Sequence, residues 1–273
     1  MRYCRFQSDS TTAYAAIEDR AGTLWATRLL TPNEVPAEDL AATRLPGPFQ
    51  PQPLSALPLL PPVTPSKILC IGRNYKDHAA ELGNELPKEP LLFLKPPSSL
   101  LAPGGTILLP SLSSRVDYEG ELAIVIGRRC RHLGPNEDVR PYIRGYTLVN
   151  DVTARDLQKS DGQWTRGKGF DTFCPTGPLV SNEIDPIEAP VTLTTRLNGK
   201  IVQQASTADL IFSIPHLLRY ITAAITLEPG DLIPTGTPAG VGSLSPGDRI
   251  QVEIAGLSIL ENTAAAEENP AAL

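Results

Sequence analysis

The sequence lacks several features that would assign the chain to a common functional class. No run of 18 apolar residues occurs, so no membrane-spanning helix is expected. Lys and Arg number 24 against 30 Asp and Glu, which gives a net charge of −6. Nucleic-acid-binding proteins usually carry a basic surface, so we expect neither a nucleic acid nor a membrane as partner. The phosphate-loop motif G-x-x-x-x-G-K-[ST] is missing too, which argues against nucleotide binding.

Cysteine is scarce, and its distribution excludes a disulfide framework. The four cysteines are widely spaced, with no C-x-x-C pair, and stand at Cys4, Cys70, Cys130 and Cys174. This pattern predicts reduced, mostly buried thiols rather than disulfides or a zinc site. The first 20 residues also lack the apolar core of a secretory signal. A cytoplasmic location is therefore expected, and a mitochondrial one stays open.

Proline, by contrast, is abundant, with 28 residues. It is concentrated in residues 46–65, where neither a helix nor a central strand could form, so this segment is expected to be an extended linker. Residues 2–30 contain three short strand-like segments with a turn at Gly22. We therefore predict two domains: a small N-terminal β domain with its Pro-rich linker at residues 1–62, and a main domain at residues 63–273.

The main domain is predicted to consist of many short strands and few helices. Buried strands are expected in KILCIGRNY and ELAIVIG, and a further strand is expected in IRGYTLVND. A short helix is expected in NYKDHAAELGNELP, ending at Gly83. The longest helix is expected in STADLIFSIPHLLRYITAAI, with Ser206 and Thr207 as candidate N-caps and a kink or restart at Pro215. These elements indicate a β-rich α+β fold.

Glu119 and Glu121 are separated by one residue and precede a strongly apolar run. On a strand, both side chains would point to the same face, where each carboxylate would raise the pKa of the other unless a cation lay between them. With Asp151 they form an all-oxygen set, which suits Mg²⁺ or Mn²⁺ better than zinc. The alternative is an exposed edge strand whose glutamates are solvated or paired with Arg115 or Arg128.

His78 and Glu81 are a candidate catalytic pair. Their i, i+3 spacing places them on one face of the predicted short helix. A glutamate bound to one imidazole nitrogen leaves the other free to accept a proton from water. The alternative is an ordinary surface pair. His132 and His216 are expected to be structural.

Two further segments combine polar groups with glycine. Residues 150–178 carry several cations, and Lys168 would offset the negative charge that three carboxylates leave on a divalent ion. The alternative is a charged surface loop. Residues 234–242 have small hydroxyls and glycines that allow the backbone to approach an anionic ligand, with Thr237 as a donor.

Taken together, these motifs resemble the fumarylacetoacetate hydrolase family. The matching segments, in chain order, are GRNYKDHAAE, FLKPPSSL, DYEGELAIVIG, GYTLVNDVTARDLQ, GKGFDTFCPTGP and GDLIPTGTPAGVG. They extend over residues 72–242, nearly the whole main domain. Gly120 departs from the family pattern, in which Ala is more usual between the two glutamates, but the ligand spacing is intact.

The resemblance implies a β-roll-like catalytic domain with one divalent cation, Mg²⁺ or Mn²⁺, per subunit. It assigns Glu119, Glu121 and Asp151 as metal ligands, His78, Glu81 and Lys168 as catalytic residues, and Arg73, Tyr75, Gln158 and Thr237 as substrate contacts. The His78–Glu81 dyad would lie on a short helix or lid over the metal. Family members are commonly homodimers, so a homodimer is expected.

The implied reaction is metal-dependent cleavage of a C–C bond in a 2-oxo or 1,3-dioxo carboxylic acid through a metal-stabilised enolate. It would be hydrolysis of an acylpyruvate or decarboxylation of an oxaloacetate-like acid. An isomerase or hydratase of unsaturated 2-oxo diacids is an alternative, and so is a protein that binds an oxo acid without turnover. The intact dyad and Lys168 argue against the last. Substrate selectivity is expected to depend on residues 83–90 and 159–167.

Overall fold

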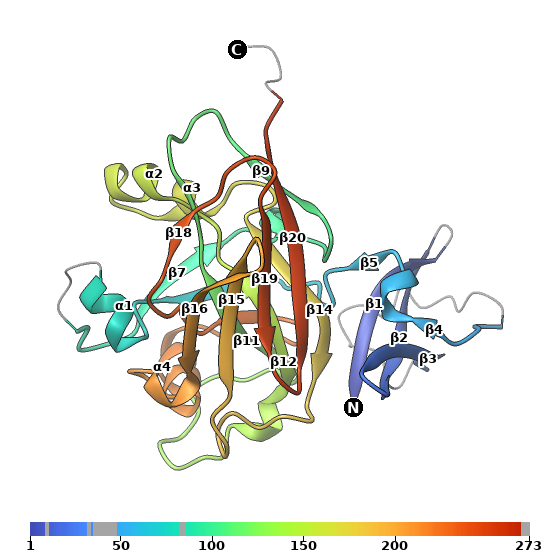
Figure 1. Ribbon diagram of the computed structural model, residues 1–273. Coiled ribbons are helices and arrows are strands. Elements are labelled where there is room, and N and C mark those ends of the chain that lie inside the picture. Colours follow the sequence, from blue (N-terminus) through green and yellow to red (C-terminus); the bar gives the residue numbers. More distant parts are fainter. Residues whose placement is uncertain (9–10, 32–33, 35–47, 82–85, 269–273) are drawn as a thin grey trace.

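The computed structural model describes residues 1–8, 11–31, 34, 48–81 and 86–268 (Figure 1). The strands are β1 (Arg2–Ser8), β2 (Thr11–Arg20), β3 (Thr23–Leu29), β4 (Gln52–Pro53), β5 (Leu59–Leu60), β6 (Ile68–Gly72), β7 (Leu91–Lys95), β8 (Leu100–Leu101), β9 (Thr106–Leu109), β10 (Val116–Tyr118), β11 (Gly120–Ile126), β12 (Ile143–Asn150), β13 (Thr153–Ala154), β14 (Cys174–Ser181), β15 (Thr192–Leu197), β16 (Lys200–Ser206), β17 (Leu232–Pro234), β18 (Gly242–Ser243), β19 (Arg249–Ile254) and β20 (Ser258–Ala266). The helices are α1 (Lys76–Glu81), α2 (Arg155–Ser160), α3 (Thr165–Lys168) and α4 (Ile214–Ala224), with 3₁₀ turns η2 (Leu54–Ala56), η3 (Pro97–Ser99), η4 (Arg140–Tyr142) and η5 (Thr207–Asp209).

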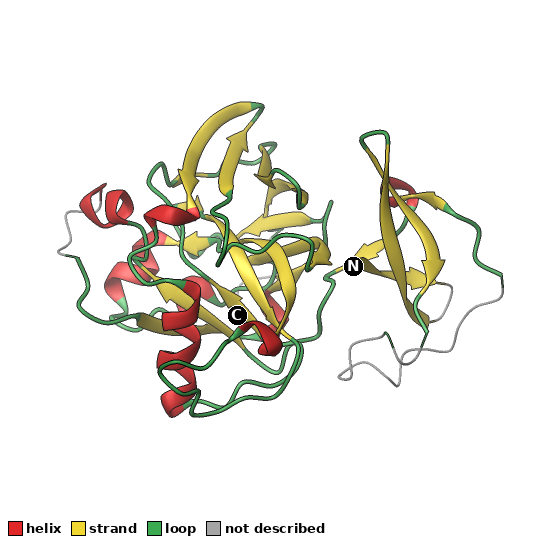
Figure 2. Cartoon of the chain, turned by 90° about the horizontal axis from the view of Figure 1, so that it is seen from below, coloured by secondary structure: helices red, strands yellow, loops and turns green. Residues whose placement is uncertain are grey.

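Strands β1 to β3 form an antiparallel meander to one side of the remaining elements, as Figures 1 and 2 both show. The described part of the Pro-rich segment is largely extended, as predicted, but it also contains the 3₁₀ turn η2. Its strands are the two-residue β4, beside β3, and β5, beside β1, because proline cannot donate to a longer ladder. β1 also pairs with β14 through Arg2 and Tyr3, which joins this unit to the large sheet. The domain division at residues 62 and 63 stays a prediction.

Strand β11 lies near the centre of the large sheet, in the order β1-β14-β12-β11-β17-β6-β7. All seven of its residues are buried, because its two edges pair with β12 and β17 and both faces are covered. The apolar run after Glu121 therefore forms a buried strand, as predicted. An edge-strand position for the two glutamates was the alternative, and the structure contradicts it.

A second, five-stranded sheet packs on the large one. Its order is β16-β15-β19-β20-β9, and β19 alternates buried and exposed residues. Leu122 and Ile124 of β11 share one apolar core with Val252 and Ile254 of β19. Two packed sheets with few helices confirm the predicted β-rich α+β fold.

The helices agree with the sequence in part. α4 is the longest helix among the described residues and buries Ile214, Leu217, Leu218 and Ile221 along one face. The prediction that Ser206 or Thr207 caps it was wrong. Ser206 caps the 3₁₀ turn η5 instead, and the long helix begins anew at Ile214, where Pro215 fits the first turn because its missing N–H has no helical partner there.

Three further expectations concern local features. α1 forms where the short helix was predicted, but its expected end at Gly83 lies outside the described residues. Residues 150–178 are not a plain loop, since they contain α2 and α3. All four cysteines are free and buried, which confirms the prediction from their spacing.

Candidate active site

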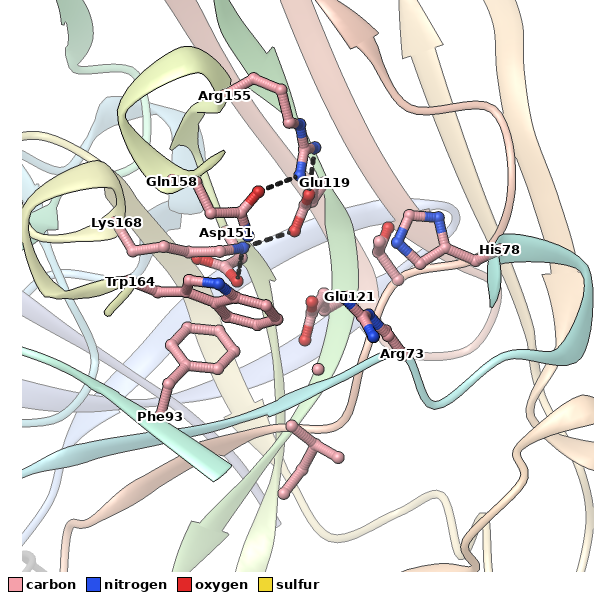
Figure 3. A pocket seen from close by; sticks show the side chains of 13 residues that line it. Arg73, His78, Phe93, Glu119, Glu121, Asp151, Arg155, Gln158, Trp164 and Lys168 are labelled. Atoms are coloured by element: carbon pink, nitrogen blue, oxygen red, sulfur yellow. Dashed lines mark hydrogen bonds and ion pairs between the residues drawn. The ribbon is translucent and has the colours of Figure 1, made fainter. Parts of the chain in front are cut away.

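Three carboxylates meet where β11 and β12 lie side by side. Glu119 precedes β11, Glu121 lies in it, and Asp151 directly follows β12, whose Asn150 pairs with Gly120. Ligand oxygens of the three lie within 4.8 Å of one another, and all three residues are buried. Figure 3 shows their side chains entering one pocket. The predicted metal ligands are therefore brought together by the register of one strand pair.

Three buried cations surround these carboxylates. Lys168 Nζ donates to Glu119 Oε2 at 2.7 Å and to Asp151 Oδ2 at 2.5 Å. Lys95 Nζ donates to Asp151 Oδ1 at 2.6 Å, and Arg155 Nη2 donates to Glu119 Oε1 at 2.5 Å. Lys95 is 1% exposed, Lys168 2% and Arg155 5%, so these pairs are shielded from solvent. In a poorly hydrated site such charges interact far more strongly than surface ion pairs.

The surroundings shift the pKa values of the two glutamates in opposite directions. Burial by itself would raise the pKa of Glu119, but Lys168 and Arg155 outweigh burial and hold its pKa well below the usual value. For Glu121, burial raises the pKa well above the usual value, and Asp151 and Glu119 raise it further. Glu119 is thus held as a carboxylate, while Glu121 lacks compensation.

The environment of Glu121 indicates that the site is suited to a metal ion. Glu121 Oε2 accepts a 2.8 Å hydrogen bond from the Gly236 N–H, but among the described residues this side chain forms no ion pair. A buried carboxylate without a cation is costly. Carboxylate oxygens have two lone pairs each, so the lysines leave acceptor capacity on Glu119 and Asp151. The three residues therefore suit a hard divalent cation.

The His78–Glu81 pair lies on α1, across the pocket from Lys168 (Figure 3). His78 Nδ1 is 3.3 Å from Glu81 Oε2, and His78 is 4% exposed. A carboxylate only accepts, so Nδ1 carries the proton and Nε2 is the basic nitrogen. Glu81 also accepts from the Gly240 N–H at 3.0 Å. This bond fastens α1 to the loop between β17 and β18.

The predicted substrate contacts occupy different positions. Arg73, Gln158 and Thr237 line the same pocket as the carboxylates, and Tyr75 does not belong to this lining. Gln158 Oε1 accepts from Arg155 Nη1 at 2.7 Å, and Thr237 Oγ1 donates to the Gly120 carbonyl at 2.9 Å. The Tyr75 hydroxyl is buried and has no hydrogen-bond partner in the described part of the chain. The roles of all four residues stay predictions.

Arg73 stands apart within this group. It directly follows β6 with a φ of 55°, a left-handed backbone conformation that non-glycine residues seldom adopt. Its guanidinium lies 6.0 Å from the centre of the Trp164 ring, and no ion pair to it is found within the described ranges. Such strain is often found at ligand sites, which is consistent with the predicted role.

Several residues in or next to the pocket were not identified as site residues from the sequence. Phe93 and Trp164 line the pocket, and Lys95 contacts its Asp151. Gln203 Oε1 accepts from the Gly120 N–H, and its Nε2 donates to Thr237 Oγ1. Arg155 is one of the cations of residues 150–178, and its place in the sequence offers no reason to assign it a separate role. The FLKPPSSL segment contains Lys95, but no local pattern indicates that its side chain reaches Asp151, 56 residues later in the chain.

Comparison with known proteins identifies the family. The family model for the C-terminal domain of fumarylacetoacetate (FAA) hydrolase matches residues 67–265, which include every carboxylate and cation described above. The chain belongs to the fumarylacetoacetate hydrolase family. The resemblance inferred from the ordered motifs is therefore confirmed.

Other members of the fumarylacetoacetate hydrolase family are similar over most of the chain. Oxaloacetate tautomerase YisK of Bacillus subtilis is 43% identical over 77% of this chain and 73% of its own length. Mitochondrial oxaloacetate decarboxylase of Dictyostelium discoideum is 45% identical over 71% of this chain and 91% of its own. The crystal structure of 2-hydroxyhepta-2,4-diene-1,7-dioate isomerase from Mycobacterium marinum has 40% identity and a TM-score of 0.82, covering 98% of this chain and 100% of that one. Their names are those of enzymes, which supports an enzymatic role for this family member.

Within the described ranges, no helix is long and apolar enough to cross a membrane.

Proposed function

We propose that this chain is a divalent-metal-dependent enzyme that generates the enolate of a compact 2-oxo dicarboxylate of the oxaloacetate type. Tautomerisation and decarboxylation of such an acid both place negative charge on the oxygen of the 2-oxo group. The buried cluster of three carboxylates and three cations, with Glu121 uncompensated, is the observation that carries the proposal.

Charge balance favours a dicarboxylate. Arg155 also pairs with the buried Asp117, and Arg115 pairs with the same carboxylate, so Asp117 and Arg115 cancel. Lys95, Lys168 and Arg155 then match the three carboxylates of the cluster, and a bound divalent cation leaves an excess of two positive charges. A 2-oxo dicarboxylate supplies two negative charges. Mg²⁺ or Mn²⁺, held by Glu119, Glu121 and Asp151, would polarise the 2-oxo group and stabilise negative charge developing on its oxygen.

The other side chains of the pocket have separate roles in the proposed reaction. Lys168 donates to two ligand carboxylates, so it holds them in one arrangement and keeps their charge compensated. Arg73, on the pocket wall without an ion-pair partner in the described part of the chain, is suited to the distal carboxylate of the acid. His78, with Nδ1 oriented by Glu81, presents Nε2 to accept a proton from C3 of the acid and return it.

The proposal is tested with metal-stripped protein. We expect no turnover of oxaloacetate in EDTA and full recovery with Mg²⁺ or Mn²⁺. Loss of enol absorbance without CO₂ release indicates tautomerisation, whereas pyruvate formation with CO₂ release indicates decarboxylation. Equal turnover with and without metal would refute the proposal.

A second candidate is hydrolysis of an acylpyruvate, and the His78–Glu81 pair is the observation that favours it. In this reaction His78 would deprotonate water rather than C3. His78→Ala is then expected to reduce acylpyruvate hydrolysis by about 10²–10⁴-fold, the usual contribution of a general base, while Mg²⁺ affinity changes little. Glu119→Gln is the matched variant, since it should weaken metal binding directly. Unchanged hydrolysis by His78→Ala would remove the pair from the mechanism.

A further inference from the structure

Two pockets of different character meet at one pair of aromatic rings. The carboxylate pocket has a volume of about 50 Å³, room for roughly four water-sized groups. A second pocket of about 670 Å³ lies against it and is lined largely by apolar residues, among them Leu69, Leu91 and Leu92. Arg73, Phe93 and Trp164 border both pockets. The inner pocket therefore has room for only a small polar head group, and the aromatic pair lies at the boundary between it and the outer apolar space.

Trp164 and Phe93 form a packed partition. Their ring centroids are 5.1 Å apart in an edge-to-face arrangement. Lys168 Nζ lies 4.9 Å from the centre of the Phe93 ring and 6.0 Å from that of Trp164. Figure 3 shows the indole beside Lys168, with Phe93 next to it and Arg73 and His78 on the opposite side of the pocket. Cation–π contacts and ring packing thus hold the indole over the inner pocket.

A glycine makes room for the indole. A Cβ added at Gly72 would lie 2.8 Å from Trp164 Cζ3 and 3.0 Å from Trp164 Cη2, closer than atoms can pack. The third neighbour, Leu91 Cδ2, would be 3.1 Å away. Gly72 therefore permits the position that Trp164 occupies, and any larger residue would displace the ring. Trp164 itself lies between α2 and α3 and is only partly buried, so it has space to move.

We propose that Trp164, supported by Phe93, sets the length of acid that the active site accepts. With the indole in place, the inner pocket admits a compact diacid and excludes an apolar acyl chain. Without the indole, the two pockets join, and an apolar chain attached to the same chelating head can extend among the leucines of the outer pocket. The inference rests on the proposed function only for the identity of the head group.

Oxamate and N-pentyloxamate provide the test, because they share one chelating head and differ only in an apolar tail. We expect wild-type protein loaded with Mg²⁺ to bind oxamate more tightly than N-pentyloxamate. In Trp164→Ala the ratio of the two dissociation constants, measured by calorimetry, should shift by at least about tenfold towards N-pentyloxamate. Tenfold is the lower end of the discrimination that one methylene provides in a hydrophobic pocket.

Two further variants keep the test independent of folding defects in Trp164→Ala. Gly72→Ala retains the indole but displaces it, so it should shift the ratio in the same direction by a smaller factor. Trp164→Phe keeps an aromatic ring against Phe93 and should lie between wild type and Trp164→Ala.

Fluorescence reports the position of the ring directly. The chain has two tryptophans, and Trp25 lies in β3, outside the site, so Trp25→Phe leaves Trp164 as the single tryptophan, which is excited selectively over the tyrosines. Adding Gly72→Ala to Trp25→Phe should shift the emission to longer wavelength as the indole moves into water.

The possible results lead to distinct conclusions. An unchanged ratio in Trp164→Ala and Gly72→Ala, both still binding oxamate, would overturn the inference, and so would a wild-type protein that prefers N-pentyloxamate. Failure of wild type to turn over oxaloacetate with Mg²⁺ or Mn²⁺ would refute the proposed function instead, because the binding ratio is measured without turnover.

Discussion

Glu121 differs from its two carboxylate neighbours in a single respect. Glu119 and Asp151 are each held by buried cations, whereas Glu121 receives only the Gly236 N–H from the residues that the structure describes. Its pKa is raised by burial and by the other two carboxylates, so the folded chain without metal retains a proton there. An unfolded chain would release that proton at an ordinary carboxyl pKa. The residue best suited to attract a cation therefore lowers the stability of the metal-free protein.

We predict that Glu121→Gln stabilises the metal-free protein. Because the folded-state pKa of Glu121 is raised, its contribution to stability is complete at low pH and is lost as pH rises above the unfolded value, roughly 4.3. Urea denaturation in EDTA at pH 5 and pH 7 should show the gap between variant and wild type growing by up to about 1.4 kcal/mol per pH unit. Added Mg²⁺ should stabilise wild type more than the variant. A gap that does not change with pH would contradict this account.

Packing between elements explains Gly120, the departure from the family pattern. A Cβ there would lie 2.2 Å from Thr195 Oγ1 in β15 and 3.2 Å from Val252 Cγ2 in β19. The glycine therefore lets the second sheet approach β11 at the position between two metal ligands. Thr195 Oγ1 is buried and finds no hydrogen-bond partner among the described residues, so removing this hydroxyl would break no hydrogen bond there.

Gly120→Ala should destabilise the protein by about 1–3 kcal/mol through overpacking against β15. Thr195→Ala alone should have a small effect, and the double variant should recover most of the loss, because the clashing atom is gone. Urea denaturation of the four proteins in a double-mutant cycle measures this coupling. Additive effects of the two substitutions would show that the contact does not limit the approach of the sheets.

The active site is assembled from segments that are distant in the chain. Arg73 directly follows β6, and His78 lies in α1. β11 and β12 position the carboxylates, and α3 contains Lys168. Glu81 on α1 is tied to Gly240, 159 residues away. A site of this kind depends on global folding, so metal binding and overall stability are coupled.

The expected homodimer is a property of the whole molecule. We predict that light scattering gives a mass of twice that of the 29.3 kDa chain, in EDTA as well as in Mg²⁺, because the described site draws its carboxylates and cations from one chain. Serial dilution is the control for weak association. A monomer at all concentrations would contradict the expectation drawn from the family.

What could be predicted from the sequence follows from local periodicity. The spacing of Glu119 and Glu121 predicts that both side chains point to the same side, and they do so although Glu119 lies one residue before β11. The apolar run after them predicts that this strand is buried. The i, i+3 spacing of His78 and Glu81 likewise determines that they share a helical face. The buried free thiols and the Pro-rich segment were likewise predicted from local features, the spacing of cysteines and the density of prolines. These properties depend on neighbouring residues in the chain and not on how the elements pack together.

Only the tertiary structure determines which groups surround the site residues. Lys95 and Arg155 compensate Asp151 and Glu119 only because sheet register and the position of α2 bring distant segments together, and Trp164 covers the pocket only because Gly72 leaves it space. Likewise, a capping pattern at Ser206 could not reveal that the long helix starts at Ile214. Side-chain charge and periodicity are local properties, whereas compensation of a buried charge depends on distances across the packed core, which no local pattern determines.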